Sequence, residues 1–319
     1  MKNNIQEIQT LVRDLKQTTA QQQITNLHRA NGLWSICAFG MDWSLIIFAC
    51  FLATKGWVAL ICSLVIIGSR QRALSNLVHD SSHRNLFVTP KLNDVIGNFF
   101  AAFAMFDTVA AYRKSHLMHH RFLGDTSIDP DAISHGRYGY DDQDPVKEKA
   151  SKTYASLLLN ERAFLDSVSG NLRALSLKER MSMAMWWGTV TVGSTLFFGG
   201  ANTFLFILMW VVSRGTSYHV IRIFAEFLDH TGLDARSTIK FTRNLPHQNV
   251  WAFLLHPHQD TYHLAHHIFM GVPHYKLREI DALLMKTKIY REAHHCDSYF
   301  IGNHSAVSCW IGNCKGNLL

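Results

Sequence analysis

The chain has 319 residues, of which 48% are hydrophobic, and its formal net charge is +7. Its mean hydropathy is near zero because long apolar runs alternate with very polar, histidine-rich stretches, which is typical of a membrane protein with large extramembrane parts. No segment repeats at a fixed period, which excludes a solenoid. No basic stripe with interleaved aromatic residues is present, so we expect no nucleic-acid partner.

The chain begins with a polar, glutamine-rich arm, residues 1–30. The arm lacks the apolar h-region of a signal peptide, so we expect a cytosolic helix or a flexible segment there. Residues 31–290 form the predicted membrane domain, and residues 291–319 form a C-terminal tail that contains cysteine and histidine.

Two apolar blocks dominate the membrane domain, residues 33–69 and residues 181–213. The first block is interrupted at residues 54–56 and the second at residues 199–202, where turn-forming residues gather. Because a bilayer core takes about 20 helical residues per crossing, each block predicts two helices joined by a tight turn. The sequence therefore predicts four transmembrane helices in two hairpins.

Charge predicts the orientation of these helices. Of the 31 lysines and arginines, only Lys55 lies in a predicted hairpin turn. The positive-inside rule therefore places both chain ends and the connecting segments on the cytoplasmic side. A shorter apolar stretch, residues 95–111, contains Asn98 and Asp107 and is expected to be interfacial or re-entrant. The predicted fold is an all-α, multi-pass integral membrane protein with a cytosolic helical cap.

Three histidine clusters lie beside the predicted membrane boundaries. The first is His79 and His83, the second is His116, His119 and His120, and the third is His263, His266 and His267. Residues three and four apart share a helix face, so each cluster points its imidazoles in one direction. Neutral imidazole is the commonest metal ligand and suits iron, copper and zinc. A single histidine would be unremarkable, but three such clusters on one side of the membrane predict a site for more than one metal ion.

A polar stripe follows the second hairpin on an otherwise apolar helix. Arg222, Glu226 and His230 are spaced by four residues, so they share one face. Charged groups near a membrane are costly and are usually paired or functional. His230 is therefore a ninth candidate ligand. Glu226 could bind a metal ion through water or pair with Arg222, and both alternatives stay open.

The three clusters, with Tyr262 before the third and Pro273 after it, resemble the histidine boxes of the membrane fatty acid desaturase and hydroxylase superfamily. The resemblance covers about residues 70–284. It implies a cytosolic cap that holds two iron ions, with the eight box histidines as ligands and O2 as co-substrate. In acyl-CoA desaturases of this family an asparagine and a histidine one turn apart complete the site, and here those positions hold Glu226 and His230.

The resemblance favours an O2-dependent desaturase that acts on a fatty acyl lipid substrate, because an iron centre can activate O2 and remove hydrogen from an unactivated C–H bond. A hydroxylase is the alternative within the family. A metal transporter is the alternative from another class, although transporters usually place their ligands at mid-membrane. The sequence has no haem, iron–sulfur or nucleotide motif, so we expect an external donor, a ferredoxin or cytochrome b5 with its reductase.

Arg72 lies seven residues before His79 and therefore on the same helix face. It could extend to lipid headgroups. Alternatively, Arg72, with Arg222, could hold a substrate carboxylate beside the metal ions. That arrangement would suit a small carboxylate or amino-acid-derived substrate instead of a long lipid.

Several further residues are candidates for supporting roles. Acidic residues that could accept the free ring N–H of a ligand histidine, or form caps and turns, are Asp80, Asp260, Asp125, Asp129 and Asp131. Two histidines could act in the same way, His256 and His258. A small zinc site in the tail would use His294, His295, Cys296, Cys309 and Cys314, although their spacing fits no common template.

Overall fold

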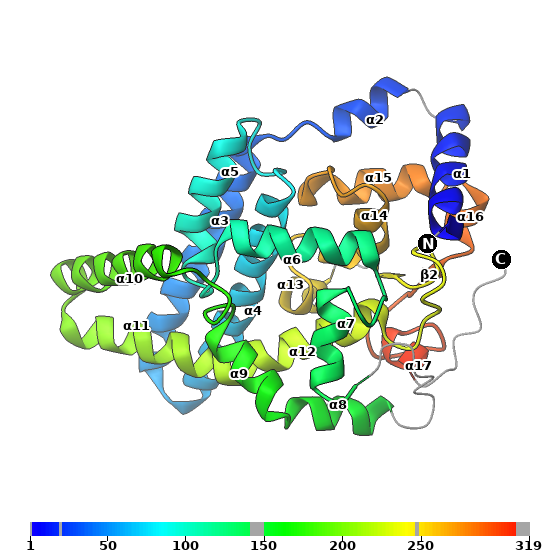
Figure 1. The fold of residues 1–319 in the computed structure, drawn as a ribbon. Coiled ribbons are helices and arrows are strands. Elements are labelled where there is room, and N and C mark those ends of the chain that lie inside the picture. The colour runs from blue at the N-terminus through cyan, green and yellow to red at the C-terminus, as the bar shows by residue number, and fades with distance from the viewer. Residues whose placement is uncertain (1, 19–20, 141–149, 246–248, 311–319) are drawn as a thin grey trace. The chain divides into compact units, whose positions relative to one another are not determined.

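The computed structural model describes residues 2–18, 21–140, 150–245 and 249–310. Within these ranges the chain is mostly helical, as Figure 1 shows, and the short strands β1 (Arg243–Asn244) and β2 (His294–His295) pair in parallel. The chain divides into two compact units, each built from segments that are distant in the sequence. Unit 1 contains residues 1–30, 115–157 and 224–319, and unit 2 contains residues 31–114 and 158–223.

Unit 2 holds the long apolar helices. Its elements, two of which continue into unit 1, are α3 (Gly32–Leu52), η1 (Ala53–Lys55), α4 (Trp57–Ser82), α5 (Pro90–Gly97), the π-helix η2 (Asn98–Ala102), α6 (Val109–Phe122), α9 (Glu161–Ser169), α10 (Leu177–Phe198), α11 (Gly200–Ser213), the π-helix η3 (Arg214–Tyr218) and α12 (His219–His230). Both predicted interruptions are present. Gly56 has φ of 130° and Gly199 has φ of 84°, conformations that glycine adopts without a steric penalty.

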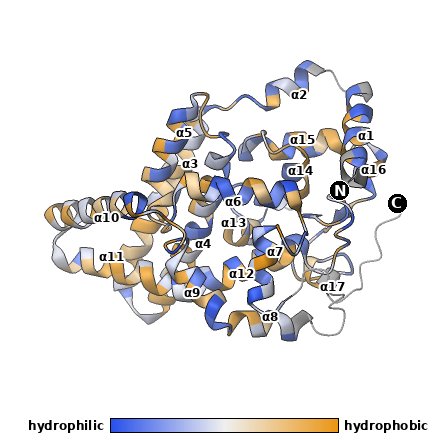
Figure 2. Ribbon diagram, viewed as in Figure 1, coloured by the Kyte–Doolittle hydropathy of each residue, from blue (hydrophilic) through white to orange (hydrophobic). Residues whose placement is uncertain are grey.

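Three helical segments are long and apolar enough to cross a membrane: Gly32–Lys55, Trp57–Ser82 and Gly200–His230. The last runs through α11, η3 and α12, so the helix continues to His230 as the sequence predicts. Figure 2 shows the hydrophobic residues along α11. Among the described residues α10 does not meet the same criteria, so the fourth crossing stays a prediction.

The interior of unit 2 combines stacked aromatic rings with a buried ion pair. Trp43 of α3 stacks on Trp210 of α11 with ring centroids 5.7 Å apart. The guanidinium of Arg70 donates to the Asp42 carboxylate at 3.0 Å, and both side chains are fully buried. A buried pair offsets its desolvation cost only when its hydrogen bonds are well formed. This pair therefore fixes α4 against α3.

Unit 1 is built from shorter elements. They are α1 (Lys2–Thr18), α2 (Gln21–Leu27), α7 (Pro130–Arg137), α8 (Ala150–Leu158), β1, α13 (Val250–Leu255), η4 (Asp260–Tyr262), α14 (His263–Ile268), η5 (His274–Lys276), α15 (Leu277–Leu284), α16 (Lys288–Arg291), β2 and α17 (Ala306–Trp310). The N-terminal arm is helical, and Leu11 and Leu15 of α1 are fully buried in a core with Leu264 and Ile280. Burial of these leucines anchors the polar arm to the segment that carries the third cluster.

Candidate metal centre

The second and third clusters and His230 lie in unit 1, and six of these seven histidines form two groups of three. The His120 group consists of His116, His120 and His266, and the His230 group consists of His119, His230 and His267. Within each group, one ring nitrogen of every histidine lies within 4.8 Å of the corresponding nitrogens of the others. Each group therefore gathers potential ligands from segments that are far apart in the chain.

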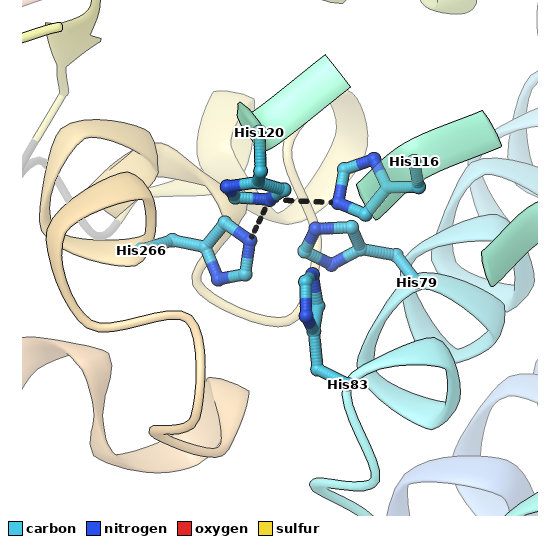
Figure 3. Close-up of side chains that lie close together, drawn as sticks. All are labelled: His79, His83, His116, His120 and His266. Carbon is cyan, nitrogen blue, oxygen red and sulfur yellow. Dashed lines mark hydrogen bonds between the residues drawn. The ribbon is translucent and has the colours of Figure 1, made fainter. Parts of the chain in front are cut away.

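The shortest contacts in these groups match the spacing of shared ligands. The Nε2 atoms of His120 and His116 are 2.9 Å apart, and those of His266 and His120 are 3.1 Å apart (Figure 3). Two nitrogens bound at right angles to one metal ion at about 2.1 Å would be about 3 Å apart. His263 adjoins the second group, with its Nε2 3.2 Å from that of His230 and 3.1 Å from that of His267.

His119 is oriented by an acidic residue that caps another helix. Its Nδ1 lies 3.0 Å from Asp129, which also accepts hydrogen bonds from the backbone N–H groups of Gly124 and Asp131. Burial of Asp129 favours the neutral acid, but the hydrogen bonds from His119 and the two backbone groups hold its pKa below the usual value. An ionised Asp129 fixes the Nδ1–H tautomer of His119 and leaves Nε2 for a metal ion.

The buried segment that runs from Phe241 into β1 orients His230. The His230 Nδ1 lies 2.7 Å from the carbonyl oxygen of Phe241, the geometry of an N–H donor to a carbonyl. The buried guanidinium of Arg243 donates to the carbonyls of Leu228 and Thr231, both at 2.6 Å. These carbonyls belong to the end of α12, where helices leave acceptors unsatisfied. Phe241 and Arg243 therefore hold the last turn that carries His230.

Asn244 holds the helix of the third cluster. Its side-chain oxygen accepts from the backbone N–H of Leu264 at 2.9 Å, at the start of α14. Its side-chain nitrogen donates to Asp281 and to the Tyr290 hydroxyl, both at 2.6 Å. All three side chains are buried. The sequence analysis missed Asn244, Arg243 and Phe241 because none of them is a ligand type in a recognisable spacing.

The first cluster lies in unit 2, at the end of α4. His79 belongs to the last turn and His83 caps the helix, and Figure 3 draws both side chains on α4. Their ring centroids are 5.0 Å apart. The guanidinium of Arg113 donates to the carbonyls of Ser81 and Ser82 and pairs with Asp94, which ties the helix end to α6 and α5.

Two of the cluster histidines, His83 and His267, have lowered pKa values. Burial, reinforced by the nearby His79, lowers the pKa of His83 to about 3. Burial and then the neighbouring histidines lower the pKa of His267 well below its ordinary value. Only the neutral imidazole can bind a metal ion, so both residues are held in the form that a ligand requires.

The structure gives the positions of three candidate supporting carboxylates and of Arg222. Asp80 is buried and accepts from Asn85 at 3.4 Å, and Asp125 accepts from Ser127 in a turn. Asp260 begins η4. Arg222 donates to the Ser167 hydroxyl at 2.8 Å.

The remaining candidates divide between α4, α12 and the third-cluster region. Arg72 and Glu226 are half-buried, on α4 and α12 respectively. The Nδ1 of His256 lies 3.1 Å from the Tyr299 hydroxyl, and the ring of His258 lies beside that of His274.

The C-terminal zinc site stays a prediction. His294 and His295 form β2, and the Nε2 of His295 lies 2.6 Å from the carbonyl of Tyr290. Cys296 is buried. The side chain of Cys309 and the whole of Cys314 lie outside the described residues.

The chain is similar to known desaturases. Residues 55–300 match the family model described as fatty acid desaturase. Over 262 residues, the chain is 29% identical to the dihydrorhizobitoxine desaturase of Bradyrhizobium elkanii, with coverage of 77% of this chain and 74% of that protein. The family match extends over most of the chain and includes all three histidine clusters, so this protein belongs to the fatty acid desaturase family and is an oxidoreductase of the desaturase type.

Proposed function

We propose that the protein is an O2-dependent membrane desaturase with two non-haem iron ions. The observation that carries the proposal is the pair of three-histidine groups in unit 1. Their nitrogen spacing, the neutral state of the buried rings and the outer hydrogen bonds of His119 and His230 all fit metal ligands. Family membership favours iron over other metals.

The nine histidines divide naturally between two ions. One ion takes the His120 group, and membership of the desaturase family favours His79 and His83 as its further ligands. The other takes the His230 group with His263, which lies next to both His230 and His267. Glu226, on the same helix as His230, is proposed to contribute through water. Asp80 and Asp260 are proposed to support ligand histidines from outside the coordination sphere.

When bound, the iron ions would activate O2 for removal of two hydrogens from adjacent carbons of the substrate. The balanced reaction consumes one O2, two electrons and two protons for each double bond and releases two waters. The chain itself holds the imidazoles neutral and fixes their tautomers. The electrons come from an external ferredoxin or cytochrome b5 with its reductase, for which the basic chain offers a complementary surface.

The apolar helices support a multi-pass membrane location. We propose that α10 provides the fourth crossing beside the three apolar segments, and that the metal centre faces the cytoplasm. The retention of positive charge outside the hairpin turns supports that orientation.

Two substrate classes are candidates. The family description favours a fatty acyl lipid. A small carboxylate or amino-acid-derived substrate is the second candidate, because the similar protein is named for its action on dihydrorhizobitoxine.

The test is turnover by the purified, detergent-solubilised protein loaded with iron and supplied with O2 and a reduced ferredoxin. We expect an alkene product, detected by mass spectrometry, and O2 consumption that depends on substrate. The control is the same preparation after removal of iron by a chelator. An alcohol as the sole product would assign a hydroxylase, and O2 consumption that is independent of iron would contradict the proposal.

A further inference from the structure

One face of α4 is half-buried next to the first cluster, whereas the rest of the helix there is buried. Between Ile67 and Ser82 the structure buries every residue of this helix except Arg72, Ser75 and His79. His83, which caps the helix, is also half-buried. The spacing of these four residues is three, four and four, so they share one helix face. We call this face the α4 strip.

The strip runs from the first cluster toward the contact between α4 and η3. His79 and His83 are the proposed ligands, and Arg72 lies about 10 Å further along the helix axis, seven residues at 1.5 Å each. One turn beyond Arg72, the strip stops at Gly68. A Cβ at Gly68 would lie 2.2 Å from the Ser217 hydroxyl and 2.5 Å from the backbone nitrogen of Tyr218, so η3 lies directly against the helix there.

The lining of the strip is polar. The Ser75 hydroxyl lies 3.3 Å from the hydroxyl of Tyr218, which is buried in η3. The residue of the strip furthest from the first cluster is an arginine, Arg72. The neighbouring buried position, Gln71, donates to the carbonyl of Trp210 at 2.9 Å. Hydroxyl and guanidinium groups offer no apolar surface to a hydrocarbon chain, whereas they can hydrogen-bond to a polar substrate.

The depth of the strip also restricts its occupant. The acyl chains of a membrane lipid fill about half of a 30 Å hydrocarbon core, or roughly 15 Å. The strip offers about 10 Å from His79 to Arg72, and η3 packs against the helix one turn further on. A short substrate with an anionic group at one end matches both its length and its lining, because arginine is well suited to bind a carboxylate.

We propose that the α4 strip selects a small substrate that carries a carboxylate, with Arg72 binding the carboxylate and Ser75 and Tyr218 forming the polar wall. The reacting carbons would then lie toward His79 and His83. This inference rests on the proposed desaturase function. It assigns substrate selection to Ser75 and Tyr218, which no sequence motif singles out, and it disfavours long acyl chains.

The test compares matched substrates on the iron-loaded protein in detergent, with O2 consumption and alkene formation as the measurements. The panel contains hexanoate, norleucine, norleucine amide, stearate and stearoyl-CoA. We expect turnover of the short acids and no turnover of the stearoyl substrates. Arg72→Gln should raise KM for the short acids about 10- to 100-fold while kcat changes little, because a charged hydrogen bond is lost in binding.

Three controls separate a binding role from a structural one. Arg72→Lys keeps the charge and should restore part of the affinity. Norleucine amide, which lacks the carboxylate, should have the same KM in the parent protein and in Arg72→Gln. Arg173→Gln removes an exposed arginine of the same unit and should leave every parameter unchanged.

The outcomes distinguish this inference from the function on which it rests. Desaturation of stearate or stearoyl-CoA alone would overturn the inference and leave the desaturase function standing. An unchanged KM for short acids in Arg72→Gln would also overturn it. A fully iron-loaded protein that consumes no O2 with any substrate would contradict the desaturase function itself.

Discussion

The first and third histidine clusters are held in place by different means. The first lies at the end of α4, a continuous helix of 26 residues. The third lies on α14, a helix of only 6 residues. Helices shorter than about 12 residues are marginal on their own in water, so α14 depends on contacts from outside itself. Asn244 supplies such contacts at the start of α14, whereas α4 needs no equivalent residue.

Two histidine clusters of similar spacing can therefore differ in how well they tolerate mutation of the residues that surround them. Around α4 the hydrogen bonds of Arg113 and Ser81 add to a helix that already forms along its whole length. Around α14 the buried network of Asn244, Asp281 and Tyr290 determines whether the ligand helix forms at all. Substitutions in the outer partners of α14 should therefore lower the iron content more than substitutions in the outer partners of α4.

The largest effect is expected for Asn244→Leu. The change leaves the Leu264 N–H without its partner and removes one of the two hydrogen bonds to the Asp281 carboxylate, so the free energy of unfolding should fall by about 3 kcal/mol. Most of the iron should be lost as well, because α14 carries ligands of both groups. Elemental analysis and a chemical denaturation curve measure the two effects.

Asn249→Leu is the matched control for this change. Asn249 caps α13, which carries no proposed ligand, by accepting from the N–H groups of Trp251 and Ala252. Loss of such a cap should cost about 1 kcal/mol and leave the iron content unchanged. Equal iron contents in Asn244→Leu and Asn249→Leu would contradict the claim that α14 depends on Asn244 to position its ligands.

Asp129→Asn should have the next largest effect. Loss of the charged partner of His119 should weaken metal binding by the His230 group about 10- to 100-fold. Competition with a chelator measures this affinity, with Co2+ as the spectroscopic probe. Asp125→Asn is the control, since Asp125 only closes a turn with Ser127 and should not change the affinity. Identical affinities in both variants would mean that Asp129 does not tune the metal.

Arg113→Gln should have a smaller effect on the first cluster. Removal of the charged hydrogen bonds to Ser81 and Ser82 should cost about 1.5 kcal/mol of unfolding free energy. Iron should be retained, because α4 still forms as a continuous helix. Lys114→Gln, at the exposed neighbouring position, provides the control. Iron loss as severe as in Asn244→Leu would show that the long helix does not suffice to position the first cluster.

Ser81→Ala should have the smallest effect of the series. Its buried hydroxyl donates to the carbonyl of Asn93 at 2.7 Å. Loss of this neutral hydrogen bond should lower the unfolding free energy by about 1 kcal/mol without change in the iron content. A thermal or chemical denaturation curve measures it. A loss of iron in this variant would contradict the robustness assigned to the end of α4.

Local features of the sequence were sufficient for much of the fold. The helix breaks at Gly56 and Gly199 follow from turn-forming residues, and the continuation of the helix to His230 follows from a spacing of four. Grouping of the histidines could be expected for the same reason, because each cluster follows helical spacing. The division of the chain into two interleaved units could not be expected, because it depends on contacts between distant segments.

The supporting residues of the site were beyond sequence reasoning. Asn244 lies 20 residues from Leu264, 37 from Asp281 and 46 from Tyr290, so no local pattern links these partners. Asp129 and Asp131 were two of several candidate carboxylates, and the position of α7 brings both of them to His119. Hydrogen bonds of this kind are specified by tertiary packing. They leave no periodic pattern of residue types in the sequence from which they could be predicted.

The most direct test of a di-iron centre is the iron content of three purified proteins: the parent chain, His83→Ala and His230→Ala. The account predicts two iron ions per parent chain and selective loss of a different ion in each variant. Mössbauer spectra of the iron that remains should therefore differ between the two variants. A parent chain that binds a single metal ion, or zinc in place of iron, would contradict the account.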